Sequence, residues 1–83
     1  MHDLLKRIEI NPKIMLGKPV IKGTRIPVEI ILRKLAYGLS PEDILTDYPN
    51  LTREDIKAAL AYAAEALSTE EIFVMEPAKS RRE

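Results

Sequence analysis

The sequence predicts a mainly α-helical fold, in which short N-terminal β-strands precede a three-helix core with a helix-turn-helix. The length of 83 residues is enough for one domain and not for two. Two glycines and two prolines fall within residues 17–28, so a helix is not expected there. From Val28 onward, apolar residues recur at the three- and four-residue spacing of amphipathic helices.

The first expected element is a strand over Leu5–Ile10, where apolar and charged side chains alternate imperfectly. Asn11 and Pro12 then end it. Residues 17–28 contain two glycines and two prolines, which favour short extended pieces joined by turns. Within them, Val20-Ile21 is the expected return strand, so the N-terminal segment resembles a β-hairpin.

The first expected helix covers residues 27–37, with Pro27 at its first position and Gly38 at its left-handed C-terminal cap. Its apolar stripe consists of Val28, Ile31, Leu32, Leu35 and Leu39.

Two further helices are marked by their capping residues. Ser40 and the carboxylate three residues later predict a short helix over residues 41–47. Thr52 begins the same pattern and predicts the longest helix, over residues 52–67. The apolar stripe expected on that helix consists of Ile56, Ala59, Leu60, Ala63 and Leu67.

We assign residues 1–67 to a single helix-turn-helix-like domain with an N-terminal β segment, and residues 68–83 to a C-terminal partner-binding tail. The tail has no helical period and is expected to be poorly ordered alone. Its most apolar run, which we expect to bind a partner as an added strand or in a groove, consists of Ile72, Phe73, Val74 and Met75. The alternative is that this run packs back on the helices as a short closing strand.

Composition argues against several function classes. The chain has no cysteine and a single histidine, so it offers no disulfide and almost no metal ligands. It also lacks a recognisable nucleophile with a base or a phosphate-binding loop motif, and we expect no catalytic residue, metal or cofactor. No apolar run approaches the roughly 18 residues that span a bilayer, and the charged N-terminus is unlike a secretory signal, so we expect a cytoplasmic protein.

Charge is distributed unevenly along the chain. Residues 1–34 carry eight basic and three acidic side chains, a net charge of +5, whereas residues 35–78 carry two basic and nine acidic ones, a net charge of −7. This asymmetry favours a nucleic acid or an oppositely charged partner, which includes a second copy of the chain. A solvated surface whose charges happen to segregate is the simpler alternative.

The two last helices and their four-residue turn match the outline of a helix-turn-helix, in which the second helix presents its N-terminal residues to the major groove of DNA. On this interpretation Thr52, Arg53, Lys57 and Ala61 point outward. Against it, Glu54 and its acidic neighbour place negative charge where phosphates would lie, and helices that only pack a core can show the same pattern. The basic N-terminal loop offers further phosphate contacts, namely Lys18, Lys22 and Arg25.

Two stretches carry a family resemblance. Residues 17–28 read GKPVIKGTRIPV, and residues 35–62 read LAYGLSPEDILTDYPNLTREDIKAALAY. Over about residues 5–66 the chain resembles the small prokaryotic proteins grouped as domain of unknown function 433. Members of that family are similar to antitoxins of the VapB type. The resemblance implies an antitoxin of a type II toxin-antitoxin system, which represses its own operon through a helix-turn-helix and neutralises a PIN-domain ribonuclease toxin.

We therefore expect a DNA-binding antitoxin with operator DNA and a PIN-domain toxin as partners. We also expect a homodimer, because the small core, the edge strand and the off-stripe Ile30 leave surface that a two-fold partner can cover. The rival hypothesis is a protein-interaction module that homodimerises and binds no DNA.

Overall fold

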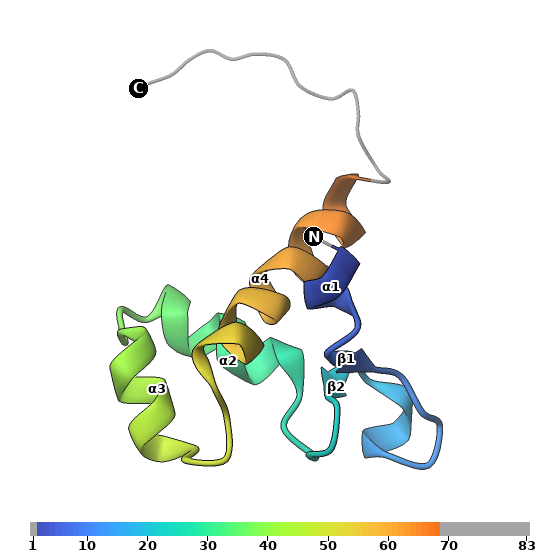
Figure 1. Ribbon diagram of the computed structural model, residues 1–83, viewed down its shortest axis with the longest axis horizontal. Coiled ribbons are helices and arrows are strands. Elements are labelled where there is room, and N and C mark those ends of the chain that lie inside the picture. The colour runs from blue at the N-terminus through green and yellow to red at the C-terminus, as the bar shows by residue number, and fades with distance from the viewer. Residues whose placement is uncertain (1, 69–83) are drawn as a thin grey trace.

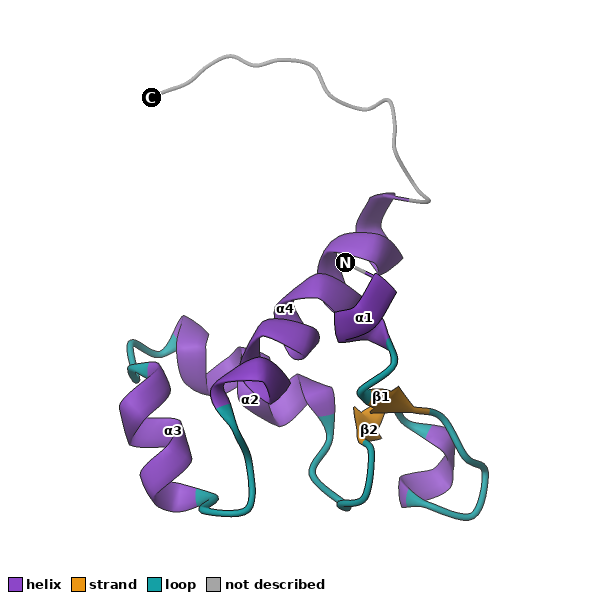
Figure 2. Ribbon diagram, viewed as in Figure 1, coloured by secondary structure: helices purple, strands orange, loops and turns teal. Residues whose placement is uncertain are grey.

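The computed structural model describes residues 2–68 of the protein (Figure 1). Along the chain its elements are α1 (His2–Leu5), β1 (Ile8–Glu9), the 3₁₀ helix η1 (Met15–Gly17), β2 (Val20–Ile21), α2 (Val28–Ala36), α3 (Pro41–Asp47) and α4 (Arg53–Ser68). The predicted fold class is confirmed, since helices dominate and a short antiparallel pair of strands precedes the three longer helices (Figure 2). The predictions for the tail and for Ile72, Phe73, Val74 and Met75 lie outside the described residues.

The N-terminal strands are shorter than the sequence predicted. Ile8 pairs with Ile21 and Glu9 pairs with Val20 in an antiparallel register, and one more hydrogen bond, from Lys22 N to Arg7 O at 2.7 Å, extends the ladder. The predicted strand over Leu5–Ile10 is wrong at its start, because Leu5 ends α1 and a tight turn follows. A partner strand of two residues can pair with no more than this short segment.

The predicted helices begin and end within one or two residues of the expected positions. α2 starts after Pro27, which adopts an extended conformation at the N-cap and not the first helical position. Gly38 has a φ of 95° and follows the C-cap, as predicted. The hydrogen bonds Gly38 N to Leu35 O and Leu39 N to Lys34 O, both 3.0 Å, close a Schellman motif that requires this left-handed residue.

Two capping boxes fix the starts of α3 and α4. Ser40 Oγ accepts the Asp43 backbone N–H at 3.1 Å, and the Asp43 carboxylate accepts the Ser40 N–H at 2.9 Å. Thr52 and Asp55 repeat the arrangement at 3.2 and 2.9 Å. These reciprocal bonds satisfy N–H groups that a helix start would otherwise leave without partners.

The core lies where α2, α3, α4 and β2 meet. Its buried members are Ile21, Val28, Ile31, Ile44, Leu51, Ile56 and Ala59. Val28, Ile31, Ile56 and Ala59 belong to the stripes that the helical spacing predicted.

The buried surface of α4 differs from the predicted stripe. Leu60 and Leu67 belong to that stripe, yet they are 50% and 72% exposed, whereas Ala58 and Ala61 are buried. The expectation that Ala61 points outward is therefore wrong. α1 and β1 pack against α4 in addition to α2 and α3, so α4 has a second covered side that its apolar spacing alone does not reveal (Figure 1).

Asp55 links the start of α4 to the N-terminal segment. Its side chain is 9% exposed, and one oxygen accepts a hydrogen bond from the Arg7 guanidinium at 3.1 Å while the other accepts the Thr52 N–H. A buried carboxylate is costly unless it is hydrogen-bonded or paired, and here it is both. The Asp55 side chain therefore caps α4 and also binds Arg7, which lies 48 positions earlier in the sequence.

We expect Asp55→Ala to lower the free energy of unfolding by about 2 kcal/mol, because it removes a capping acceptor and the partner of Arg7. Urea unfolding followed by far-UV circular dichroism measures the change. The control is the exposed neighbour Glu54, whose replacement by Ala is expected to stay within about 0.5 kcal/mol. Equal effects of the two substitutions would contradict the role of Asp55.

Candidate nucleic-acid interface

The two helices expected to contact DNA are joined by residues 48–52, and α4 is the longer of the two. Leu51 is buried in this connection and Tyr48 is half-buried, which anchors the turn to the core. Thr52, Arg53 and Lys57 are exposed at the start of α4, as a recognition helix requires.

The cations of this set already have carboxylate partners. The Arg53 guanidinium donates a hydrogen bond to Glu42 of α3, and Lys57 Nζ lies 3.9 Å from Glu54. Thr52 uses its hydroxyl oxygen to cap its own helix. A nucleic acid would therefore have to compete with protein carboxylates for Arg53 and Lys57.

The ion pair between Glu42 of α3 and Arg53 of α4 shifts the pKa of both side chains. The hydrogen bond from Arg53, reinforced by its charge, lowers the pKa of Glu42 from its ordinary value. The same bond to Glu42 raises the pKa of Arg53. Both side chains are more than half exposed, so the pair adds little to stability.

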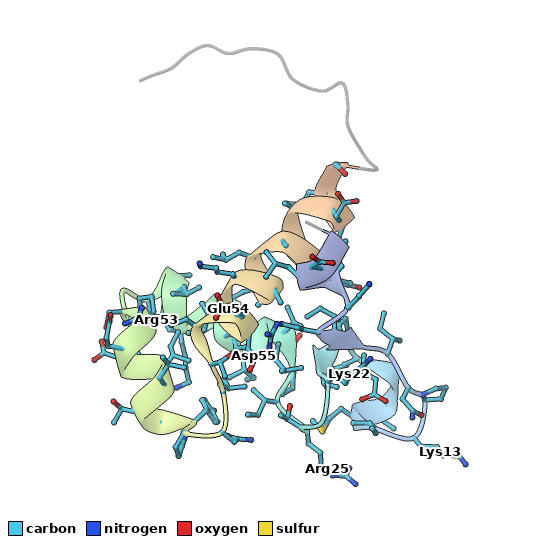
Figure 3. All side chains as sticks on the ribbon, in the orientation of Figure 1. Lys13, Lys22, Arg25, Arg53, Glu54 and Asp55 are labelled. Carbon is cyan, nitrogen blue, oxygen red and sulfur yellow. The ribbon has the colours of Figure 1, made fainter. Side chains whose placement is uncertain are left out.

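The second predicted set lies in the N-terminal loop. Lys18 Nζ pairs with Glu29 at 3.1 Å. Lys22 and Arg25 form no ion pair with any carboxylate of residues 2–68, and the same is true of the neighbouring Lys13. Figure 3 shows these three cations at the end of the molecule formed by the strands and their loops, well separated from Arg53. The structure thus divides the six predicted residues between two places.

A polar cavity of about 340 Å³ lies between the N-terminal segment and the first turn of α4. It is lined by Asp3, Lys6, Arg7, Lys22 and Asp55. Lys22 therefore lies beside the first turn of α4, together with two cations that the sequence did not single out as site residues. Lys6 and Arg7 belong to the basic N-terminal segment, but no local pattern could show that this segment meets Asp55.

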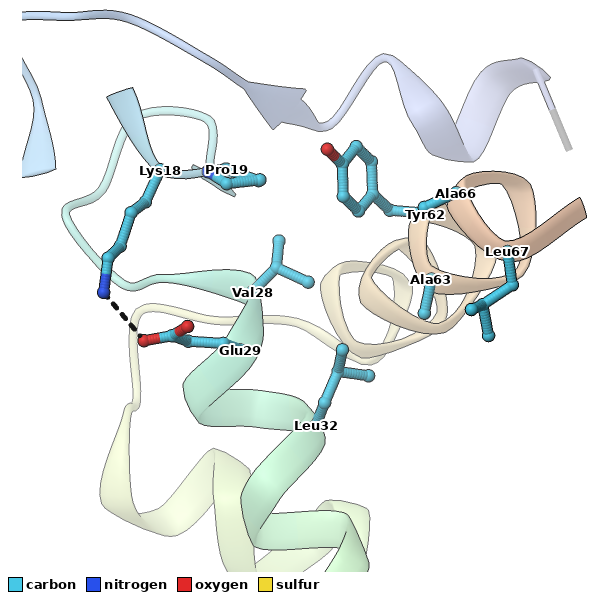
Figure 4. A pocket seen from close by; sticks show the side chains of 9 residues that line it. All are labelled: Lys18, Pro19, Val28, Glu29, Leu32, Tyr62, Ala63, Ala66 and Leu67. Carbon is cyan, nitrogen blue, oxygen red and sulfur yellow. Dashed lines mark hydrogen bonds and ion pairs between the residues drawn. The ribbon is translucent and has the colours of Figure 1, made fainter. Parts of the chain in front are cut away.

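A second cavity, of about 380 Å³, is mostly apolar (Figure 4). It lies between α2 and the C-terminal half of α4 and is lined by Lys18, Pro19, Val28, Glu29, Leu32, Tyr62, Ala63, Ala66 and Leu67. We call it the α2–α4 groove. The ion pair between Lys18 and Glu29 stands at one end of it and Leu67 at the other (Figure 4).

The part of the chain that the structure describes shows no group of three or more His, Cys, Asp or Glu side chains placed to hold a metal ion. Within the same residues, no helix has both the length and the apolar character needed to cross a membrane.

Comparison with known proteins places the chain in a family. The family described as "Protein of unknown function (DUF433)" matches residues 8–63, which is more than half of the sequence. The chain belongs to the DUF433 family. The matched region runs from β1 through most of α4, so it includes the strand pair, α2 and α3.

Two relatives and one solved structure are similar to this DUF433 chain. "Uncharacterized protein y4eO" of Sinorhizobium fredii is 42% identical over 66 residues, which cover 76% of this chain and 30% of that protein. An "Uncharacterized protein" of Archaeoglobus fulgidus is 55% identical over 29 residues, or 35% of this chain and 81% of that one. The crystal structure of a DUF433 member from Anabaena variabilis superposes with a TM-score of 0.69 at 34% identity, covering 77% of this chain and 63% of that one. The chain thus spans less than a third of the Sinorhizobium protein.

We expect Arg53→Gln to raise the pKa of Glu42 back toward its ordinary value, because the hydrogen bond and the charge that lower it are both removed. A carbon-detected NMR titration of the Glu42 carboxyl measures this shift. Because the lowered pKa belongs to the folded state, the contribution of the pair to stability is present above the ordinary pKa and is lost as the pH falls through the lowered one.

The matched control for this titration is Lys57→Gln, which removes an exposed cation of the same helix that does not contact Glu42. In the Lys57→Gln variant, the pKa of Glu42 should stay close to its value in the unmodified protein. An unchanged Glu42 pKa in Arg53→Gln would show that the two side chains are not paired in solution.

Proposed function

We propose that this DUF433 protein is a cytoplasmic antitoxin of a type II toxin-antitoxin system, which binds operator DNA through α3 and α4 and neutralises a PIN-domain ribonuclease toxin. The observation that carries the DNA-binding part is the exposed N-terminal turn of α4, with Thr52, Arg53 and Lys57 accessible after a short connection from α3. The antitoxin part is supported by the family resemblance.

The charges of the described residues favour a division of labour within this interface. Arg53 and Lys57 are neutralised by Glu42 and Glu54, so α4 brings little net positive charge to DNA. Lys22 and Arg25 have no such partners among residues 2–68 and are better suited to contact phosphates, where charge decides affinity. We assign phosphate contacts to the loop and base contacts to α4.

We assign binding of the toxin to the C-terminal tail. Its apolar run, Ile72, Phe73, Val74 and Met75, has the length and character of a segment that binds as an added strand or in a groove. Neutralisation would follow if this segment covered the toxin's active site.

A second candidate function is a homodimeric interaction module that binds no DNA. It is favoured by the pairing of α4 cations with carboxylates and by exposed apolar side chains at Ile10 and Leu60, which are 58% and 50% exposed. Exposed apolar side chains are suited to a protein partner, and Ile10 directly follows the edge strand β1.

Variants of the two basic sets test DNA binding. We expect Lys22→Ala with Arg25→Ala to weaken binding to operator and unrelated DNA alike, and to reduce the slope of log affinity against log salt by about 2. Arg53→Ala with Lys57→Ala should instead lower the preference for the operator over unrelated DNA. Fluorescence anisotropy with a duplex from the protein's own promoter measures both effects.

Arg33→Ala is the control, because Arg33 is an exposed cation of α2 outside both sets. If only the loop variant changes binding, α4 is not the recognition helix. If the unmodified protein binds no DNA even at low salt, the DNA-binding function is rejected and the interaction module is favoured.

In either candidate function we expect a homodimer, with a mass of twice 9.4 kDa by light scattering at micromolar concentration. Ile10→Glu should shift the protein toward the monomer, because it places a charge beside the edge strand β1. Leu16→Glu is the matched control, since Leu16 is 95% exposed and lies in the separate turn η1. A monomer mass for the unmodified protein would reject the dimer.

A further inference from the structure

The α2–α4 groove opens where the described part of the chain ends. Ala63, Ala66 and Leu67 belong to the last two turns of α4 and line the groove together with Val28 and Leu32 of α2 (Figure 4). Leu67 is 72% exposed at its rim, although it is one of the largest apolar side chains of the helix. Apolar groups that cover both this exposed side chain and the adjacent apolar cavity would remove apolar surface from water, which lowers the free energy.

We propose that the groove is filled by the chain's own tail, with residues 72–75 lying across it in the free protein. These four residues form the apolar run Ile-Phe-Val-Met, which includes the chain's single phenylalanine. The proposal goes beyond the antitoxin function and does not depend on it.

The connection is long enough for the tail to turn back. α4 ends at Ser68, one residue after Leu67 at the rim of the groove. Four residue steps from Ser68 to Ile72 span up to roughly 14 Å when extended, more than two turns of helix. The run can therefore enter the groove beside Leu67 without any change in α4.

The charged pair at the far end of the groove indicates in which direction the tail would lie along it. Lys18 and Glu29 form their ion pair there, opposite Leu67 (Figure 4). A tail that enters at Leu67 brings its last apolar residue, Met75, toward this pair, and the next residue is Glu76. Glu76 would have to compete with Glu29 for the Lys18 ammonium, so the match is one of order: the apolar run of the tail lies along the apolar walls, and its next, charged residue reaches the charged end of the groove.

A tethered tail is a better occupant than a free ligand. Small-molecule sites combine apolar walls with a few convergent polar groups, whereas the charged side chains here form a half-exposed pair at the rim. A segment attached at the rim has an effective concentration in the millimolar range, which weak apolar contacts can exploit. A second copy of the chain offers the same segment only at its bulk concentration.

Occupation of the groove would make the tail unavailable to other partners. Residues 72–75 cannot contact the groove and a toxin at the same time. Any partner that binds this run must first displace it, and its apparent affinity falls in proportion to the fraction of molecules with a free tail.

Disulfide trapping in the full-length chain tests the proposal. The protein has no cysteine, so Lys18→Cys with Met75→Cys introduces a single possible intramolecular bond. A disulfide requires the two Cα atoms to approach within about 7 Å, which demands that the tail reach the far end of the groove. The Lys18 side chain is 52% exposed, so its replacement leaves the core intact.

The control pair is Lys57→Cys with Met75→Cys. Lys57 is 64% exposed on α4 and is 11 residues from Ser68 along the same helix, a distance of roughly 16 Å that seven tail residues can also span. We expect the groove pair to form its intramolecular disulfide about tenfold faster than the control or more, and Phe73→Ser to remove that advantage. Equal rates for the two pairs, or a groove pair that links two chains in place of one, would overturn the proposal.

Discussion

The fold depends on one buried carboxylate. Asp55 closes the capping box at the start of α4 and accepts the Arg7 guanidinium, so the same group sets where the longest helix begins and where the N-terminal segment lies. That segment includes β1, and β1 fixes β2 through their pairing. Lys22, which follows β2, is held beside the first turn of α4 as a result. The geometry of the proposed DNA interface thus derives from a contact that is itself structural.

The sequence was most informative where structure is local. Capping residues and helical spacing predicted α2, α3 and α4 closely, because caps and periodicity act within one or two turns. They did not predict α1, since four residues show no period, nor the burial of Ala61, which lies outside the predicted apolar stripe of α4. The candidate DNA-binding residues were predicted from their residue type and from their expected position on the surface. Their ion pairs across elements, such as Arg53 with Glu42, follow from tertiary packing and have no sequence signal.

The charge asymmetry along the chain is partly neutralised by folding. Arg7 pairs with Asp55 and Lys34 with Asp47, so two ion pairs join the basic N-terminal part to the acidic helices. Within residues 2–68, the basic side chains that form no ion pair are Lys13, Lys22, Arg25 and Arg33, and the first three of these lie in the N-terminal loops. A sequence-level charge count therefore overstates the surface that remains for a charged partner.

The 48 residues between Arg7 and Asp55 also order the assembly of the domain. α2, α3 and α4 follow one another through short connections, and contacts between neighbours in sequence form sooner because their loops cost less entropy to close. On the ribosome the N-terminal segment emerges first and yet acquires its partner last, because Asp55 arrives with α4. Until Asp55 has been synthesised Arg7 lacks this partner, so the N-terminal segment cannot take its final place in the domain before α4 is made.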